Sequence, residues 1–447
     1  MINRRRVVAG STASAAALAV MTSQAIAQHL QTVSYQPSAP NPASDWTDAV
    51  LYAVKKVNIA PPEASRYLAI AHMAGFAAMN GIVGRYEDSL GVGRGPIGAD
   101  AFVAFHVAAE AALDLTMPGS FGGLKRNKLR AVPSSTAKSA AIKWGTHVGK
   151  KIGAQRASDG AESIKNTPRY DVYGAGDDPM KWALTSGETN PIPILPGWGR
   201  VAPFGVHRIK SHRADPFPHP SSEAFWGDVK LIKAVGGTHS TLRRPDHEHL
   251  AHFWEDGPHS VTPPGHFLQI ARQLFEGRLD AVDFARAMAL TSMALADAGL
   301  SAWDSKYAYD ILRPETAIRG RMTQIAGYSQ HQVKVDPQWS AIIPNPRFPA
   351  YVSGHSTFGA AGARMMQLIN GSDRARLALR SPDDHLQPRH HQGKTRYFSS
   401  IWETAVENGL SRIYGGVHWT FDHDGGMTSG KSIADEIFSR HFRPVGY

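Results

Sequence analysis

Phe348-Pro-Ala-Tyr-Val-Ser-Gly-His-Ser-Thr-Phe-Gly-Ala-Ala361 is the stretch around which the rest of this 447-residue chain is arranged. Its proline-bounded start predicts an extended turn, and the small residues that follow predict a helix. Ser353 stands at a typical N-cap position, and Gly354 allows a ligand close to the backbone. The free N–H groups of a first helical turn favour an anion, beside which His355 can move protons near neutral pH. The tripeptide is common before helices, so its weight depends on what accompanies it.

Two cations precede this turn in the sequence. Lys306 and Arg313 lie seven residues apart, a spacing that places both on one face of a helix, with Trp303 just ahead. Pro314 is expected to end that helix. A solvated basic face is the ordinary interpretation of such a pair, but the neighbouring aromatic and aliphatic residues favour a half-buried helix.

A third cluster follows the turn and contains Ser411-Arg412, His418 and Asp422. His418 and Asp422 are neighbours if a helix is continuous there, or they meet through a short turn after Gly415-Gly416. In either case an acid on Nδ1–H would fix the imidazole tautomer and leave Nε2 as a lone-pair donor. The three clusters together supply three cations, a hydroxyl, a backbone N–H and two histidines. This set predicts a cage for a tetrahedral oxyanion that is bonded to His418 Nε2.

The clusters resemble the signature shared by vanadium-dependent haloperoxidases and type 2 acid phosphatases. That signature is carried by Lys306-x6-Arg313-Pro314, by Ser353-Gly354-His355 and by Ser411-Arg412-x5-His418-x3-Asp422. The surrounding text is similar to the vanadium chloroperoxidase type in Ala296-Asp-Ala-Gly299, Trp303, Phe348-Pro-Ala-Tyr351 and Ser411–Trp419. Val352 departs from the pattern, because many members have proline there, and this is expected only to loosen the turn.

The resemblance implies a role for each matching residue. Vanadate, with vanadium at +5, would be the cofactor, and His418 would be the protein ligand of its metal. The vanadate oxygens would be held by the following groups: Lys306, Arg313, Ser353, the Gly354 N–H and Arg412. His355 would be the acid–base group, with Lys306, His418 and Asp422 as further catalytic residues. Trp303 and Phe348 would line the halide pocket, and two aromatic residues there resemble the chloroperoxidase pattern.

The implied reaction is oxidation of a halide by hydrogen peroxide to hypohalous acid, which then halogenates a small organic acceptor. Lys306 would draw charge as the O–O bond breaks, and vanadium would act as a Lewis acid. Two alternatives stay open. The same His418 would be the nucleophile of a secreted acid phosphatase that hydrolyses phosphate monoesters through a phosphohistidine. The third reading is a non-catalytic oxyanion-binding protein, against which the acid–base His355 argues.

The helical patterns predict an all-α fold with two four-helix bundles and a long irregular insert between them. The bundles are expected at 45–156 and 263–447, and the Pro-, Gly- and Trp-rich insert at 157–262. Expected helices cover 45–57, 61–79, 99–115, 134–156, 265–276, 280–299, 301–312, 354–366, 396–413 and 420–441. Residues 371–395 are expected to form a polar connection.

Two histidine patterns are better explained without metal. His72 lies in an apolar helical stripe, where a packed core histidine is the stronger interpretation. A zincin helix needs the motif His-Glu-x-x-His, but in the run His247-Glu248-His249-Leu-Ala-His252 the position of the second histidine, 251, is alanine. No firm helix is predicted there.

The N-terminus predicts export. Arg4-Arg5-Arg6, a mild apolar run and Ala25-Ile-Ala27 resemble a bacterial signal peptide over 1–27, of the twin-arginine or general secretory type, before a linker over 28–44. The protein is therefore expected in the periplasm or outside the cell. The chain has no cysteine, which excludes disulfides and thiol chemistry. Its net charge of +10 is dispersed, which favours small anions over nucleic acid, and no run is long enough to span a membrane. The oligomeric state is not predicted.

Overall fold

The computed structural model describes residues 41–117, 121–165, 178–185, 192–331, 333–382 and 395–446. The signal peptide predicted at 1–27 and almost all of the predicted linker lie outside these ranges. The N-terminal helices are α3 (Pro42–Val57), α4 (Pro61–Val83), α5 (Ala101–Leu113), α6 (Gly122–Arg130) and α7 (Thr136–Ala157). Helix α3 begins inside the range that the sequence assigned to the linker, because the Asn41 side chain caps it.

Small residues bring α5 and α7 close together. Gly145, Gly149 and Gly153 recur every fourth residue and form one stripe of α7. A Cβ added to Gly149 would lie 2.5 Å from the carbonyl oxygen of Ala108 on α5. Side chains at these positions would therefore force the two helices apart.

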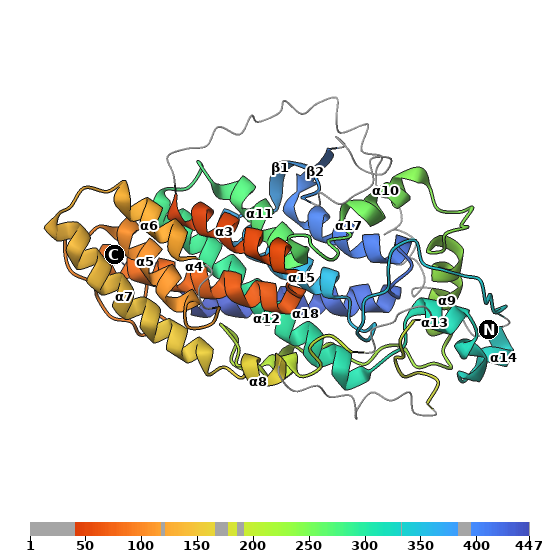
Figure 1. Ribbon diagram of the computed structural model, residues 1–447. Helices are drawn as coiled ribbons and strands as arrows, with labels where there is room; N and C mark the ends of the chain where they lie inside the picture. The colour runs from red at the N-terminus through yellow and green to blue at the C-terminus, as the bar shows by residue number, and fades with distance from the viewer. Residues whose placement is uncertain are drawn as a thin grey trace, which may run out of the picture.

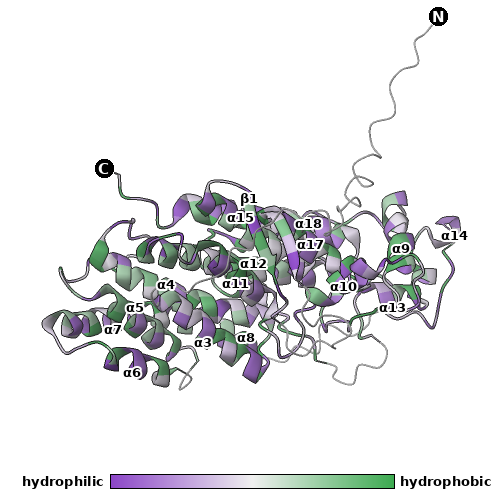
Figure 2. Ribbon diagram, turned by 90° about the horizontal axis from the view of Figure 1, so that it is seen from above, coloured by the Kyte–Doolittle hydropathy of each residue, from purple (hydrophilic) through white to green (hydrophobic). Residues whose placement is uncertain are grey.

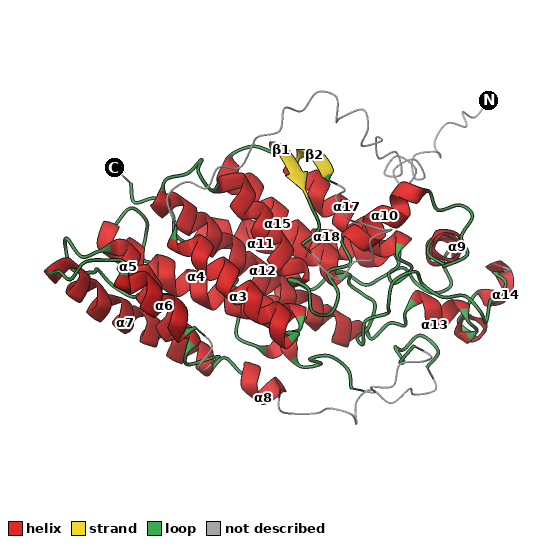
Figure 3. Cartoon of the chain, turned by 45° about the horizontal axis from the view of Figure 1, so that its top comes forward, coloured by secondary structure: helices red, strands yellow, loops and turns green. Residues whose placement is uncertain are grey.

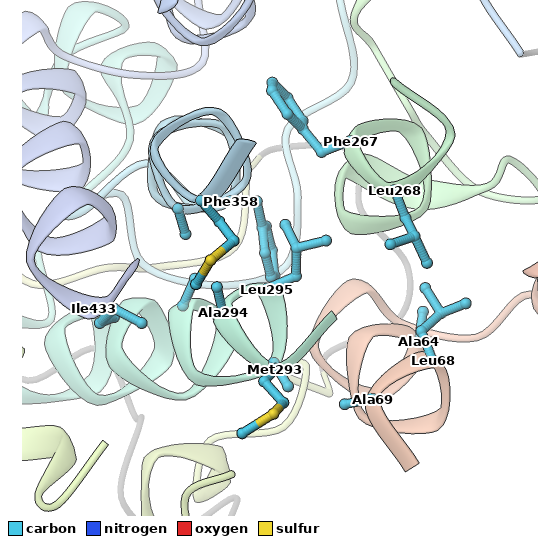
Figure 4. Packing of buried hydrophobic residues seen from close by; sticks show 14 of the residues in the cluster. Ala64, Leu68, Ala69, Phe267, Leu268, Met293, Ala294, Leu295, Phe358 and Ile433 are labelled. Atoms are coloured by element: carbon cyan, nitrogen blue, oxygen red, sulfur yellow. The ribbon is translucent and has the colours of Figure 1, made fainter. Parts of the chain in front are cut away.

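The central element of the molecule is α12 (Ala281–Tyr309), which spans about 44 Å at the rise of an α-helix. It packs against α4 on one side and against α15 (Gly354–Asn370) and α18 (Thr420–Arg440) on the other. Figure 4 shows the core at this junction, with buried side chains from α4 (Leu68), α12 (Leu295) and α15 (Phe358). The two helical groups thus share one continuous apolar core.

The C-terminal group contains α11 (Thr262–Phe275), α12, α15, α17 (Ile401–Tyr414) and α18. A two-stranded antiparallel sheet, β1 (Arg374–Leu379) and β2 (Arg396–Ser400), lies beside α15 and α17 at the top of Figure 1 and is drawn yellow in Figure 3. The prediction of an all-helical fold is confirmed in its main point. In the described part of the chain, β1 and β2 are the only strands, and every other element is a helix or a 3-10 turn.

The insert is less irregular than its composition suggested. Its helices are α8 (Ala161–Lys165), α9 (Glu223–Val235) and α10 (Pro245–Phe253), with short 3-10 turns η1 (Trp198–Arg200) and η2 (Ile209–His212). Shorter helices α13 (Pro314–Ile318) and α14 (Tyr328–His331) and the turn η3 (Arg321–Gln324) follow later in the chain. Figures 1 and 2 both show α9, α13 and α14 at the end of the molecule opposite α6 and α7.

Four expectations about elements were wrong. The helices expected at 280–299 and 301–312 are one helix, α12, because Ser301 bonds the His212 carbonyl and caps nothing. The connection at 371–395 contains β1, whose burial alternates residue by residue. The helix expected from 396 begins at Ile401, because the Ser400–Glu403 capping box starts it there. A helix, α10, does cover His247–His252, with proline in its first turn.

Within the described residues, no helix combines the length and apolar character needed to cross a membrane.

Candidate active site

Lys306 lies in the last turn of α12 and is completely buried. Its Nζ donates to the carbonyl oxygens of Pro349 at 2.9 Å and Ala350 at 3.0 Å, and also to that of Val352. The ammonium group therefore fixes the extended segment that leads into α15. Val352 is buried and contributes its carbonyl to this contact, so the departure from proline leaves the segment in place.

Arg313 does not lie on the helix of Lys306, contrary to the sequence prediction. Helix α12 ends at Tyr309 because Asp310 adopts a left-handed conformation, and Pro314 begins α13 instead of ending α12. Arg313 donates to the Phe348 carbonyl from both Nε and Nη2 and to the Val417 carbonyl from Nη1 at 2.7 Å. The two cations reach the same region from two elements.

The Ser353-Gly354-His355 turn forms the N-terminus of α15, as predicted. Ser353 Oγ accepts from the Ser356 N–H at 3.3 Å as the N-cap, which leaves its own hydroxyl hydrogen available. The Gly354 N–H forms no hydrogen bond within the described residues. His355 Nε2 lies 3.2 Å from the Glu255 carbonyl oxygen, which orients the ring.

His418 lies in the turn between α17 and α18, which decides between the two arrangements that the sequence left open. Gly416 makes this turn with a φ of 79°. Asp422, in the first turn of α18, accepts from His418 Nδ1 at 2.7 Å and from the Trp419 N–H at 3.0 Å. Arg313 Nη1 lies 3.1 Å from His418 Nε2, and because a guanidinium only donates, Nε2 is the acceptor. Nδ1 therefore carries the hydrogen, and the Nε2 lone pair accepts from Arg313.

Arg412 approaches the same place from α17. One of its nitrogens, Nη1, lies 3.4 Å from the Glu255 carbonyl oxygen. Its Nε is buried and has no hydrogen-bond partner among the described residues. A buried guanidinium N–H without an acceptor is costly, so the site calls for an acceptor that the described residues do not supply.

The site concentrates positive charge away from water. Lys306, Arg313 and Arg412 are all buried, and none of them forms an ion pair with a carboxylate of the described residues. Burial lowers the pKa of Lys306 well below its usual value, that of Arg313 to about 9 and that of Arg412 to about 10. The carboxylates that oppose this lowering act without direct ion pairing: Asp422 on Arg313, and Glu255 and Asp256 on Arg412.

The acid–base groups respond to the same environment. Burial, followed by Arg412, holds the pKa of His355 well below its ordinary value, and burial with Arg313 and Lys306 does the same for His418. Burial raises the pKa of Asp422 to about 8, against the opposing effect of Lys306. Both histidines are therefore neutral at neutral pH, and a bound anion would raise their pKa again.

Two aromatic residues close one side of this group. The rings of Trp303 and Phe348 lie 4.8 Å apart. Lys306 Nζ lies 4.8 Å from the centre of the Phe348 ring, and the Arg313 guanidinium lies 5.0 Å from it. The Trp303 indole N–H donates to the Ile194 carbonyl of the insert. The predicted halide-pocket residues thus line the site, and the insert contributes to its wall.

Sequence reasoning missed the groups that act through the backbone. The backbone carbonyl of Glu255 contacts both His355 and Arg412. A pattern of side chains in the sequence cannot predict such a contact, because every residue has a backbone carbonyl. Asp297, for which the sequence suggested no role, accepts the N–H groups of Phe204, Gly205 and Val206 and so attaches the insert to α12. The His247–His252 run forms no metal site within the described part of the chain. The predicted core histidine, His72, is completely buried.

Comparison with known proteins agrees with this geometry. Residues 286–446 match the family model of the VCPO second helical-bundle domain. This part of the chain is therefore similar to a helical-bundle domain of the vanadium chloroperoxidase type. The vanadium chloroperoxidase of Curvularia inaequalis is 31% identical over 251 residues, a match that spans 43% of this chain and 39% of that protein. The resemblance to the vanadium haloperoxidases is therefore confirmed, although the match spans well under half of that relative.

Solved structures of this type share the fold. The crystal structure of the first bacterial vanadium-dependent iodoperoxidase has a TM-score of 0.76 at 23% identity, with 92% of this chain and all of that chain covered. A holo-type bacterial vanadium-dependent chloroperoxidase has a TM-score of 0.67 at 17% identity, with 91% of this chain and 98% of that chain covered. Both similarities show the fold, not the reaction.

Proposed function

We propose that this protein is a vanadate-dependent haloperoxidase, which uses hydrogen peroxide to oxidise a halide to hypohalous acid and so halogenates small organic acceptors. The observation that carries the proposal is the His418 Nε2 acceptor among three buried cations that form no ion pair with a carboxylate of the described residues. Vanadate fits this set, because it is an oxyanion whose metal accepts a fifth ligand. The fit is supported by the Arg412 Nε–H, which is buried and lacks an acceptor.

The residues that would hold vanadate divide into one bond and several charge contacts. His418 Nε2 would bond the metal, since Asp422 keeps the hydrogen on Nδ1. Its oxygens would accept from the following groups: Lys306, Arg313, Arg412, the Ser353 hydroxyl and the Gly354 N–H. Lys306 and Arg313 donate to the chain itself in this structure, so each would exchange one of those contacts for an oxygen of the anion. When bound, vanadate would supply Lewis-acid activation of peroxide without a change in oxidation state.

The proton balance assigns a task to His355. In the overall reaction hydrogen peroxide, halide and one proton give hypohalous acid and water, so the O–O bond is reduced while the halide loses two electrons. Burial keeps His355 neutral, so its free ring nitrogen can take a proton from peroxide and later return it. Lys306, held by three carbonyls, would stabilise the negative charge that develops as the O–O bond breaks.

Trp303 and Phe348 would receive the halide. A halide fits beside an aromatic wall next to two cations, and the short distances from the Phe348 ring to Lys306 and Arg313 support this assignment. We also propose export of the protein to the periplasm or the medium, where peroxide and halide are the small-molecule partners. This location is supported by the signal-like residues 1–27.

The test is halide oxidation by the purified protein. Vanadate-loaded protein is mixed with peroxide and iodide, bromide or chloride in turn, and halogenation of a trapping dye is followed. A second reaction contains a chromogenic phosphate ester and no vanadate. Halogenation that requires vanadate and disappears in His418→Ala supports the proposal. Ester hydrolysis that vanadate inhibits, without halogenation, would make the protein a phosphatase. Vanadate binding without either reaction would favour a non-catalytic oxyanion-binding protein.

A further inference from the structure

The turn that carries His418 is held from outside the candidate site by one helix of the insert. This turn joins the end of α17 at Tyr414 to the start of α18 at Thr420. His418, in the middle of this turn, must stay close to Lys306 and Arg313, which lie on two other elements. A small displacement of the turn would separate His418 Nε2 from these cations. The elements that hold its two ends are therefore part of what builds the site.

Helix α9 presents one face to both ends of the turn. Phe225, Asp228, Ile232 and Gly236 follow one another at helical spacing and form this face. The Phe225 ring is stacked at 5.9 Å on that of Phe421, which begins α18. An acidic residue between Phe225 and Ile232, both buried, needs an explanation, because carboxylates are rarely placed on such a face.

Asp228 caps α18 from outside that helix. Its Oδ2 accepts from the Phe421 N–H at 3.1 Å, and its Oδ1 accepts from the Thr420 hydroxyl. The N-cap residue of α18 is Trp419, which forms no side-chain capping bond of its own. The first N–H groups of a helix lack partners inside it, so the carboxylate of Asp228 satisfies donors that α18 leaves open.

The far end of α9 holds the other end of the turn. A Cβ added to Gly236 would lie 2.5 Å from Gly416 Cα, so the two glycines are in backbone contact. Gly416 has the positive φ that forms the turn, and Ile343 packs against Gly415 beside it. The segment from Gly416 to Phe421 is thus bracketed by Gly236 at one end and Asp228 at the other.

We propose that Asp228 is a positioning residue for His418, and that α9 fixes the imidazole by capping α18 at the turn where Asp422 orients the ring. The reasoning is geometric: the Phe421 N–H and the Thr420 hydroxyl, which Asp228 binds, belong to the two residues immediately before Asp422. The inference rests on the proposed function in one respect only, namely that His418 bonds vanadate. Asp228 itself contacts neither the cations nor the expected anion.

The experiment compares two losses of a helix cap. Asp228→Ala removes the cap of α18, and Asp100→Ala removes a matched cap of α5, where Asp100 accepts from the N–H groups of Phe102 and Val103 at 3.0 Å each. Orthovanadate affinity of the full chain is measured by calorimetry well below both melting temperatures. Asp228→Ala is expected to weaken vanadate binding about 10- to 100-fold, as outer-shell changes at metal sites do. Asp100→Ala should stay within about twofold of the wild type, although both variants melt earlier.

A second readout works without vanadate. The ring-nitrogen chemical shifts of His418, assigned with His418→Ala, report which nitrogen carries the hydrogen in the free protein. The wild type is expected to show hydrogen on Nδ1, and Asp228→Ala a mixture of tautomers. Asp228→Asn keeps an acceptor for the Phe421 N–H and should recover most of the affinity.

The outcomes separate the two proposals. Equal vanadate affinity and unchanged ring shifts in Asp228→Ala and Asp100→Ala would overturn the role of Asp228, whatever the enzyme does. Weakened vanadate binding in Asp228→Ala, in a protein that oxidises no halide, would support the positioning role and defeat the haloperoxidase proposal. If the wild type does not bind vanadate, the ring shifts alone decide the question.

Discussion

Arg66 and Arg156 of the N-terminal bundle are buried with Asp159 between them, whereas the three buried cations of the candidate site have no such partner. Asp159 accepts from Arg66 Nε at 2.8 Å and from Arg156 Nη2 at 2.9 Å. At the site, Lys306 and Arg313 instead donate to backbone carbonyls, and Arg412 keeps an unbonded Nε–H.

The difference distinguishes a buried cation that stabilises the fold through an ion pair from a buried cation that can bind an anionic ligand. A buried charge is tolerated when a counter-charge and hydrogen bonds accompany it, and costs several kcal/mol when they do not. In the N-terminal bundle Asp159 supplies a counter-charge to both arginines, although Arg66 Nη1 is also buried without a hydrogen-bond partner among the described residues. The candidate site obtains a counter-charge only when an anion binds. The free-energy cost of the unpaired buried cations is then relieved, and this relief contributes to the affinity for the anion.

The change expected to have the most effect removes the ligand bond on one side of this comparison. His418→Ala should lower halide oxidation about a thousandfold or more, because no other side chain offers a lone pair at that position. His72→Gln is the matched control, since His72 is an equally buried histidine of α4. Initial rates with saturating vanadate check the prediction, and comparable losses in both variants would show that burial, not ligation, matters.

Replacing one arginine in each region should change stability in opposite directions. Arg66→Met is expected to cost about 3 kcal/mol, because it leaves the Asp159 carboxylate short of a partner. Arg412→Met should stabilise the vanadate-free protein by about 1 kcal/mol, since a poorly paired buried charge disappears. Urea unfolding curves measure both changes. A loss of stability in Arg412→Met similar to that of Arg66→Met would contradict the difference between the regions.

Acid should weaken the N-terminal bundle through His72. Burial lowers its folded-state pKa from 6.5 to about 3, so the unfolded chain takes up the proton first as the pH falls. Stability from this group is therefore complete above pH 6.5 and lost between 6.5 and 3, with a loss of about 2 kcal/mol at pH 5.

His72→Gln should remove this part of the pH dependence, and the amide can still donate to Thr47, which contacts His72 Nε2 at 3.1 Å. The measurement is the free energy of unfolding at pH 7 and pH 5, with and without vanadate. Vanadate should not restore the loss that comes from His72, because that ring is remote from the anion in another bundle. Identical pH slopes for the two proteins would refute the assignment.

The smallest effect concerns the aromatic wall of the site. Phe348→Leu keeps the side chain apolar but removes the ring that lies near Lys306 and Arg313. The preference among iodide, bromide and chloride should shift by less than about tenfold, as expected for the loss of two weak cation–π contacts. Competition between halides at fixed peroxide measures it. A change in vanadate affinity as large as the change in preference would mean that Phe348 supports the anion site instead.

Much of the site could be predicted because its residues stand in three short motifs. Ser353, Gly354 and His355 are consecutive, and His418 and Asp422 belong to one turn, so local spacing already brings them together. The joint action of Lys306 and Arg313 was predicted for a wrong reason, since the helix ends at Tyr309 and Arg313 caps another element. Local patterns do not reveal a left-handed residue such as Asp310.

The rest depends on contacts between distant segments. Asp228 lies 190 residues before His418 in sequence, and its role follows only when α9 packs on the turn. The sequence contains the features that predict α9, namely the Ser222 cap and the helical spacing of Phe225, Val229 and Ile232. They were overlooked because the surrounding sequence is rich in proline and glycine. The strands β1 and β2 were missed because each is only five or six residues long and begins with arginine, a pattern that also suits a polar loop.

The most direct test of the account is a calorimetric titration of the purified protein with orthovanadate, together with its melting curve. The account predicts one bound vanadate per chain and a stabilisation of about 2.7 kcal/mol when vanadate is present at a hundred times its dissociation constant. Arg412→Met should lose most of this stabilisation, while Arg66→Met should keep it on a less stable protein. Absence of binding heat and of any shift in melting would contradict the claim that the buried cations form an oxyanion site.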